Sequence, residues 1–134
     1  MLAIYLKRYP LSLLTILAII LLSLLPIPEV KMMQNISLAD KWGHMLMYGG
    51  LVCIIWFEYL RSHKELQPKK LAMLAFLAPI AMGGLLELLQ AYATTCRSGE
   101  WFDFAANSIG VSLGTICGLT FAYFKLNRQK RTSK

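Results

Sequence analysis

The sequence predicts an all-α membrane protein, a bundle of four transmembrane helices with both termini in the cytoplasm. Hydrophobic residues make up 57% of the 134 residues and charged residues only 16%, with a mean hydropathy of +0.53. A water-soluble chain of this size has too few polar residues to cover so much apolar surface. Four apolar stretches each approach the roughly 20 residues that a helix needs to cross about 30 Å of hydrocarbon. We expect helices because lipid offers the backbone no hydrogen-bond partner.

The first stretch, residues 10–27, is the shortest and follows Lys7 and Arg8. Basic residues before an apolar run also begin a signal peptide. However, the segment LLSLLPIPEV lacks small residues at the usual cleavage spacing and contains two prolines. We therefore expect a retained first helix.

The other three helices follow without any change in composition that would divide the chain. We expect residues 1–124 to form a single four-helix membrane domain and residues 125–134 a basic cytoplasmic tail with frayed structure. Pro79, with Gly83 and Gly84 after it, predicts a local bend in the third helix. The three later helices are expected at about residues 41–60, 71–92 and 103–124.

The fourth helix contains a ridge of small residues, Gly110, Gly114 and Gly118. Small residues four positions apart share a helix face and let another helix backbone approach closely. The ridge predicts packing within the bundle, and it would also suit a homodimer seam.

Basic residues predict the orientation. Eleven of the 14 Lys and Arg residues lie in the N-terminal segment, the loop after the second helix and the C-terminal tail. By the positive-inside rule these segments are cytoplasmic, which predicts a multi-pass membrane protein with both termini on that side. The net charge of +7 is then an orientation signal with some attraction to anionic headgroups, and nucleic-acid binding is not expected.

Polar residues gather at the outer ends of three helices. Lys41 and Arg97 lie at this level, and each of the three helices adds a pair three or four positions apart, which shares one face: Asp40 with His44, Glu87 with Gln90, and Asp103 with Asn107. A charged group facing lipid near the bilayer centre costs several kcal/mol. We therefore expect the polar faces to turn toward one another and form a site.

Each of these residues also has a purely structural interpretation. Asp40 and Asp103 would serve as helix N-caps, Lys41 would extend to the interface, and His44 would be a core histidine. Gln90 and Asn107 would hydrogen-bond between helices. Glu87 is the hardest to explain in this way, because an acid inside an apolar helix needs a partner or a proton.

Together these motifs resemble the VanZ-like membrane proteins of bacteria. The resemblance rests on DKWGH at residues 40–44, ELLQ at 87–90, Arg97, and DFAANSIG at 103–110. It covers about residues 40–118, and the first helix matches in position only. The chain departs from the family before Arg97, where it has TTC and members often have Pro-Gly. The family is named for a member linked to low-level resistance to the glycopeptide teicoplanin.

The first functional hypothesis is a binding site for an anionic lipid, such as a polyprenyl-phosphate-linked cell-envelope precursor. Lys41 and Arg97 would hold a phosphate through an ammonium and a guanidinium group. Gln90 and Asn107 would donate hydrogen bonds to phosphate or sugar oxygens.

The second hypothesis is a membrane-embedded hydrolase or transferase. His44 would be the base or nucleophile, Asp40 or Asp103 would orient it, and Glu87 would be the general acid. His44, Glu87 and an aspartate would suit a divalent metal, but the outer side has only one histidine, so neither a metal nor another cofactor is expected. The third hypothesis is a structural or accessory bundle in which the polar cluster only joins helices.

Overall fold

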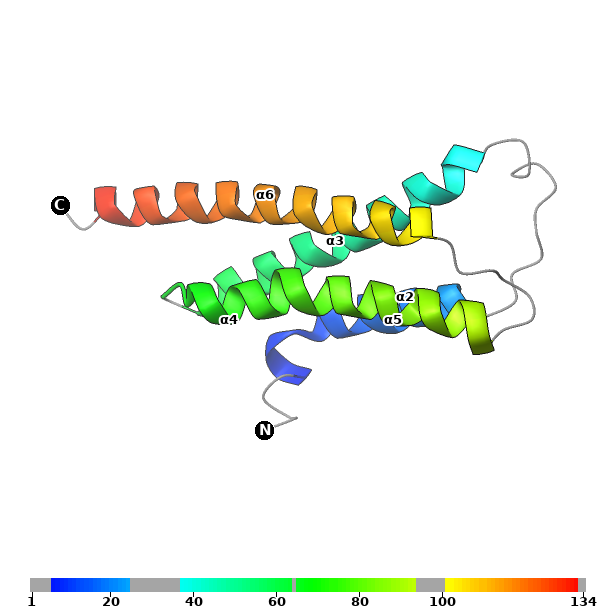
Figure 1. Ribbon diagram of the computed structural model, residues 1–134. Coiled ribbons are helices and arrows are strands. Elements are labelled where there is room, and N and C mark those ends of the chain that lie inside the picture. The colour runs from blue at the N-terminus through cyan, green and yellow to red at the C-terminus, as the bar shows by residue number, and fades with distance from the viewer. Residues whose placement is uncertain (1–5, 25–36, 64, 94–100, 133–134) are drawn as a thin grey trace.

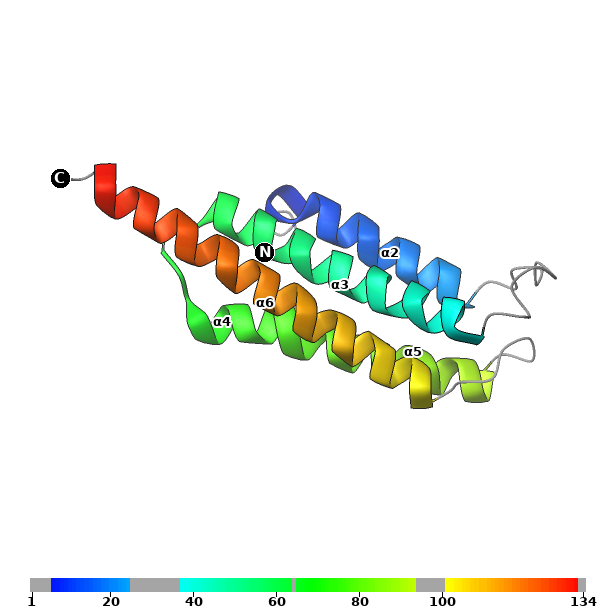
Figure 2. The ribbon, with the colours of Figure 1, turned by 90° about the horizontal axis from the view of Figure 1, so that it is seen from above.

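The computed structural model describes residues 6–24, 37–63, 65–93 and 101–132, and these residues include no β-strand. Four helices lie alongside one another as a bundle (Figures 1 and 2): α2 (Pro10–Leu24), α3 (Ser37–Ser62), α5 (Ala78–Ala93) and α6 (Trp101–Thr132). The short helix α4 (Pro68–Ala72) and the π-helix η1 (Met73–Leu77) lead directly into α5. The all-α fold class is thus confirmed.

Three helical stretches are long and apolar enough to cross a membrane: Asp40–Ser62, Lys69–Tyr92 and Trp101–Arg131. Helix α2 is equally apolar, but its 15 residues span about 22 Å, less than the roughly 30 Å of a hydrocarbon core. Large hydrophobic side chains are exposed on all of the long helices. These features are those of a multi-pass membrane protein.

Helix α6 is longer than the sequence suggested. It continues through the basic segment to Thr132 and extends beyond the other helices (Figures 1 and 2), so the expectation of a frayed tail is wrong for residues 125–132. Lys, Arg, Gln and Leu are good helix formers, and Lys130 and Arg131 lie in the last turn, where positive charge complements the helix dipole.

Helices α3 and α6 run in the same direction and pack together more extensively than any other pair of described helices. The glycine ridge of α6 faces α3, where Gly110, Gly114 and Gly118 meet the Met45 carbonyl, the Gly49 carbonyl and the Trp56 ring, respectively. A Cβ atom on Gly114 would lie 2.7 Å from the Gly49 carbonyl oxygen, so only glycine permits this approach. The ridge therefore serves packing within the bundle, and a homodimer seam through it would have to displace α3.

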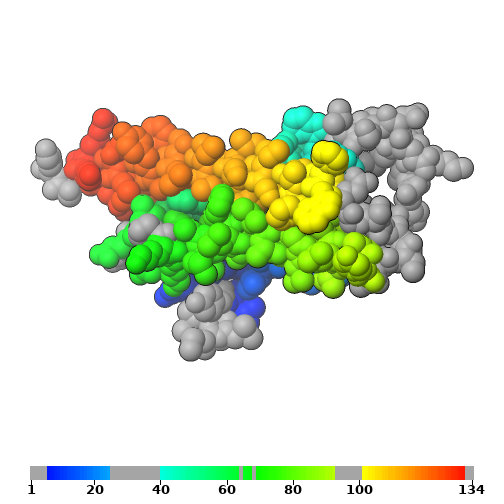
Figure 3. Space-filling model, in the orientation of Figure 1, coloured from blue at the N-terminus to red at the C-terminus, as the bar shows by residue number. Residues whose placement is uncertain are grey.

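The third long helix is irregular before Pro79, in the π-helix Met73–Leu77. The bend was expected later, at Gly83 and Gly84, which lie within the α-helix Ala78–Ala93. Proline has no N–H, and its ring conflicts with the carbonyl four residues earlier, here that of Ala75. One residue before the proline, the Ala78 N–H donates to the Met73 carbonyl, five residues back, in the π pattern. Helix α5 then packs against α6 along the face seen in Figure 3.

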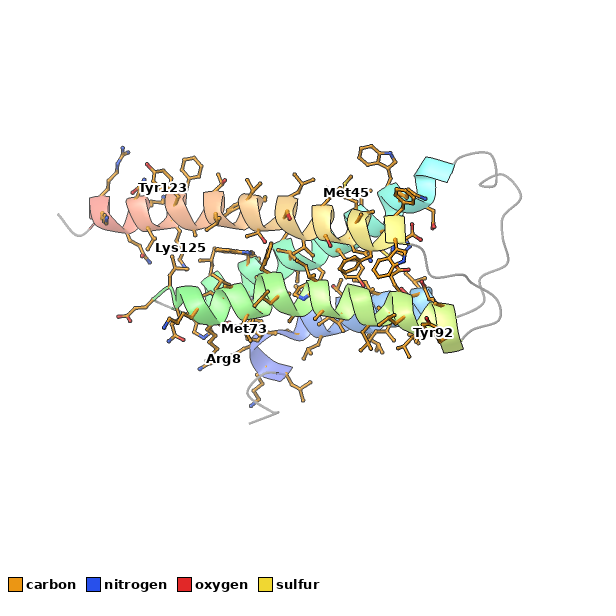
Figure 4. The ribbon with its side chains drawn as sticks, in the orientation of Figure 1. Arg8, Met45, Met73, Tyr92, Tyr123 and Lys125 are labelled. Carbon is orange, nitrogen blue, oxygen red and sulfur yellow. The ribbon has the colours of Figure 1, made fainter. Side chains whose placement is uncertain are left out.

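Exposed aromatic residues mark both ends of the bundle. Tyr92 lies at one end, and Arg8 and Lys125 lie at the other (Figure 4). We call the first the His44 end and the second the Lys125 end. Each end carries exposed aromatic side chains: Trp42, Tyr92, Trp101 and Phe102 at the His44 end, and Phe121, Tyr123 and Phe124 at the Lys125 end.

The two aromatic groups have the spacing of a membrane. Phe102 and Tyr123 are both exposed on α6, and at 1.5 Å per residue they are about 32 Å apart along the helix axis. Aromatic residues concentrate at the two membrane–water interfaces, which lie about 30 Å apart. The polar residues around His44 therefore lie near one interface, and Lys125 lies just beyond the other.

Candidate functional site

The polar residues of α3 and α6 meet at the His44 end. His44 Nδ1 lies 3.1 Å from Asn107 Oδ1, and His44 Nε2 lies 3.8 Å from Asp103 Oδ2. Lys41 Nζ is 3.8 Å from Asp103 Oδ1. The two helices come this close because Gly110 of α6, about one turn after Asn107, packs against the backbone of Met45 on α3. We call Asp40, Lys41, His44, Asp103 and Asn107 the His44 cluster.

The Asn107 amide fixes the chemistry of the His44 ring. Its oxygen accepts, so the ring donates from Nδ1, and in the neutral imidazole Nε2 keeps its lone pair. That lone pair faces the Asp103 carboxylate at 3.8 Å, beyond hydrogen-bond distance. The space between them suits a bound cation.

Lys41 and Asp40 form the accessible edge of the cluster. The Lys41 side chain is 30% exposed and Asp40 is exposed as well, whereas His44, Asp103 and Asn107 are buried. The ammonium lies 6.0 Å from the centre of the exposed Phe102 ring, at the limit of a cation–π contact. A ligand that reaches the cluster from the interface would therefore meet Lys41 and Asp40 before the buried residues.

Three members of the cluster have the arrangement of metal ligands. One ligand atom each from Asp40, His44 and Asp103 lie within 4.8 Å of one another. Carboxylates and imidazole together suit several divalent ions. A metal-binding histidine usually donates its other N–H to an oxygen, as His44 does to Asn107. The sequence suggested His44, Glu87 and one aspartate for such an ion, and the structure instead groups His44 with two aspartates.

The N-cap interpretation of the two aspartates is wrong. Helix α3 begins at Ser37 and α6 at Trp101, so Asp40 and Asp103 both lie inside the first turn. An acid in the first turn still complements the helix dipole. Asp103, however, is buried and faces His44 and Lys41 instead of solvent.

Glu87 reaches the same level from α5. It is 9% exposed and does not face lipid. Gly83, one turn earlier on the same face, lies against Asn107 and Tyr48, where an added Cβ would be 3.3 Å from each side chain. Since α5 is antiparallel to α6, Glu87 is level with Asp103, and it interacts electrostatically with Tyr48. It also lines a hollow of about 220 Å³ between α5 and α6.

The structure joins Gln90 to another helix and does not describe Arg97. Gln90 is buried, and its Nε2 donates a 2.8 Å hydrogen bond to the Ser23 carbonyl, joining α5 to α2. Gln90 thus makes a hydrogen bond between helices, as its structural interpretation predicted. Arg97 lies outside the described residues.

The sequence analysis missed Glu58, a second acid inside an apolar helix. It is 3% exposed on α3, at the Lys125 end. Its carboxylate accepts hydrogen bonds from the Leu11 N–H at 2.8 Å, the Ser12 N–H at 3.0 Å and the Ser12 hydroxyl at 2.5 Å. Glu58 thus caps the start of α2 from a neighbouring helix. Like Glu87, Glu58 is an acid within an apolar stretch, so the same sequence signal could have identified it.

Comparison with protein-family models, curated proteins and solved structures finds no match for this chain. The chemistry must therefore be judged from the His44 cluster itself. It combines an accessible ammonium, a buried imidazole and two carboxylates near a membrane interface. Such a cluster can bind an anionic headgroup through Lys41, or hold a divalent cation between His44 and the aspartates.

Proposed function

We propose that this chain is a VanZ-like protein of the bacterial cytoplasmic membrane whose His44 cluster binds an anionic lipid headgroup. The ligand class is a phosphate-bearing lipid, including lipid-linked cell-envelope precursors of the polyprenyl-phosphate type. The observation that carries the proposal is Lys41 at the exposed edge, paired at 3.8 Å with Asp103, which also faces His44. The resemblance of residues 40–44, 87–90 and 103–110 to that family supports it.

Four spans with both termini in the cytoplasm are part of this proposal. The basic residues of the Lys125 end support a cytoplasmic location of that end by the positive-inside rule. The His44 cluster then lies in the outer leaflet. The fourth span would be the apolar stretch of the sequence that contains α2.

The depth of the cluster favours a headgroup over a soluble ligand. Trp42, Trp101 and Phe102 are exposed around it and mark the interfacial layer, where lipid phosphates lie. An approaching phosphate would compete with Asp103 for the Lys41 ammonium. Arg97, in the adjoining segment of the sequence, would add a bidentate contact.

Lipid binding by purified protein tests this proposal. Lys41→Gln and Arg97→Gln should each weaken binding of a polyprenyl phosphate by about 10-fold or more, because a hydrogen bond to a charged group contributes about 1.5–3 kcal/mol. Thermal stability should change little. Lys69→Gln removes a charge at the Lys125 end and should bind like the parent. Parent-like binding by both test variants would contradict the proposal.

A metal-assisted hydrolase or transferase is the second candidate function. The observation that favours it is the convergence of Asp40, His44 and Asp103 within 4.8 Å, with His44 oriented by Asn107. A bound divalent ion would polarise a phosphate oxygen or activate water. Metal analysis after equilibration with Zn²⁺ or Mn²⁺ should then find one ion per chain, lost in His44→Ala and kept in His63→Ala. Equal metal content in these two variants would exclude the metal site.

A further inference from the structure

A second hollow lies at the Lys125 end, far from the His44 cluster. It has a volume of about 320 Å³ and runs between α3 and α6, past Cys53 and Cys117. This volume is at the lower end of the roughly 300–1,000 Å³ of small-molecule pockets. Phe57 and Phe121 line the hollow, and both side chains are exposed on the apolar outer surface of the bundle. Its walls are therefore accessible to an acyl chain from the bilayer.

Two cations from different helices stand at one end of this hollow. Arg61 comes from the last turn of α3, and Lys125 comes from α6. The Lys125 ammonium donates to the Leu60 carbonyl, which holds it beside Arg61. An ammonium has three N–H donors, so Lys125 retains donors for another acceptor. Figure 4 shows Lys125 pointing from α6 toward the other helices.

The depth of these cations matches that of a lipid phosphate. Lys125 follows the exposed Tyr123 and Phe124, which mark the interface at this end. The apolar part of the hollow extends from the cations toward the bilayer centre, to Cys53 and Cys117. From the bilayer centre outward, the hollow is first apolar and then cationic. A phospholipid has the same order, with its acyl chains inside and its phosphate at the interface. Basic pockets between transmembrane helices on the cytoplasmic side are known to bind anionic headgroups.

We propose that this hollow is a binding site for an anionic phospholipid, with an acyl chain between α3 and α6 and its phosphate on Arg61 and Lys125. The site is separate from the His44 cluster and does not depend on the function proposed for it. Gly118 and Trp56 both line the hollow, and the Trp56 ring lies where a side chain on Gly118 would be.

Native mass spectrometry of the detergent-purified full chain, with phosphatidylglycerol and phosphatidylcholine offered in equal amounts, tests this site. The parent should retain phosphatidylglycerol preferentially. Arg61→Gln combined with Lys125→Gln should lower its retention by about 10-fold or more. The matched control, Lys69→Gln combined with Lys70→Gln, removes the same charge from α4 and should behave like the parent.

A second variant tests the slot without touching either cation. Cys117 is exposed and lines the hollow, so Cys117→Trp should fill it. A parent-like melting temperature in detergent would show that the fold survives the substitution. It should lose phosphatidylglycerol as the double variant does. Equal retention of the two lipids by the parent, full retention by Cys117→Trp, or an equal loss in the Lys69 and Lys70 control would each overturn the proposal.

Discussion

His44 on α3 and Asn107 on α6 are joined by a 3.1 Å hydrogen bond inside the bundle, where the two residues are 4% and 1% exposed. Asn107 also lies against Gly83 of α5, so three helices meet at this side chain. The bond determines which nitrogen of the histidine faces Asp103. Asn107 is therefore a positioning residue for any chemistry that His44 performs.

Loss of this amide should destabilise the protein. Asn107→Ala leaves the His44 N–H buried without its acceptor, which costs about 1–3 kcal/mol. The melting temperature in detergent should fall measurably. Ser112→Ala is the control, because Ser112 is exposed on the same helix and bonds only within it, to the Ser108 carbonyl. A similar fall in both variants would mean that the effect is not specific to the bond with His44.

The glycine ridge gives a second prediction. Gly114→Ala would place a methyl group 2.7 Å from the Gly49 carbonyl oxygen, which is backbone and cannot rotate away. Forcing the two helices apart should cost about 1–3 kcal/mol of stability. Gly50→Ala adds the same methyl group where nothing lies within 4 Å, and alanine is the better helix former, so stability should stay equal or rise slightly. Equal stability of the two variants would contradict the packing of α3 on α6.

The sequence was informative where a pattern repeats with the period of a helix. Apolar length and the spacing of polar pairs led to the helices and to the juxtaposition of His44, Asp103 and Asn107. Each pair shares a face, and only one arrangement keeps these faces away from lipid. The close approach of α3 was also foreseeable, because a Gly-x3-Gly ridge presents a flat surface to a neighbouring helix.

Other features depend on which helices are neighbours, and the sequence does not determine this locally. Gln90 has the same spacing from Glu87 as a site residue would have, yet it donates to the Ser23 carbonyl of α2. Glu58 resembles an isolated acid until α2 is seen to begin beside it. The start of α3 at Ser37 was also missed, because polar residues before Asp40 obscure the boundary.

Glu58 leads to a third prediction. Its two oxygens accept all three hydrogen bonds at the start of α2, and its negative charge faces the positive end of that helix. Glu58→Gln replaces one acceptor with an amide donor and removes the charge. The expected loss is about 1–3 kcal/mol, seen as a lower melting temperature in detergent. Glu65→Gln is the matched control, since Glu65 is exposed in the connection before α4. A parent-like melting temperature for Glu58→Gln would show that the cap is dispensable.

The orientation of the bundle gives the last prediction. Fusion of a reporter after Lys134, or within residues 61–70, should give a cytoplasmic signal, because eleven of the 14 basic residues lie on that side. A reporter inserted within residues 94–100 should give the opposite signal. Arg61 and Lys125, the two cations that line the hollow between α3 and α6, would then face the leaflet that carries most anionic lipid. A periplasmic signal after Lys134 together with a cytoplasmic one at 94–100 would mean that the bundle is inverted and that the His44 cluster lies in the inner leaflet.

Substitution of Arg128, Lys130 and Arg131 by Gln tests whether the basic tail or the other basic residues determine the orientation. If the remaining basic residues suffice, the signals stay as they are; if the tail dominates, they become mixed.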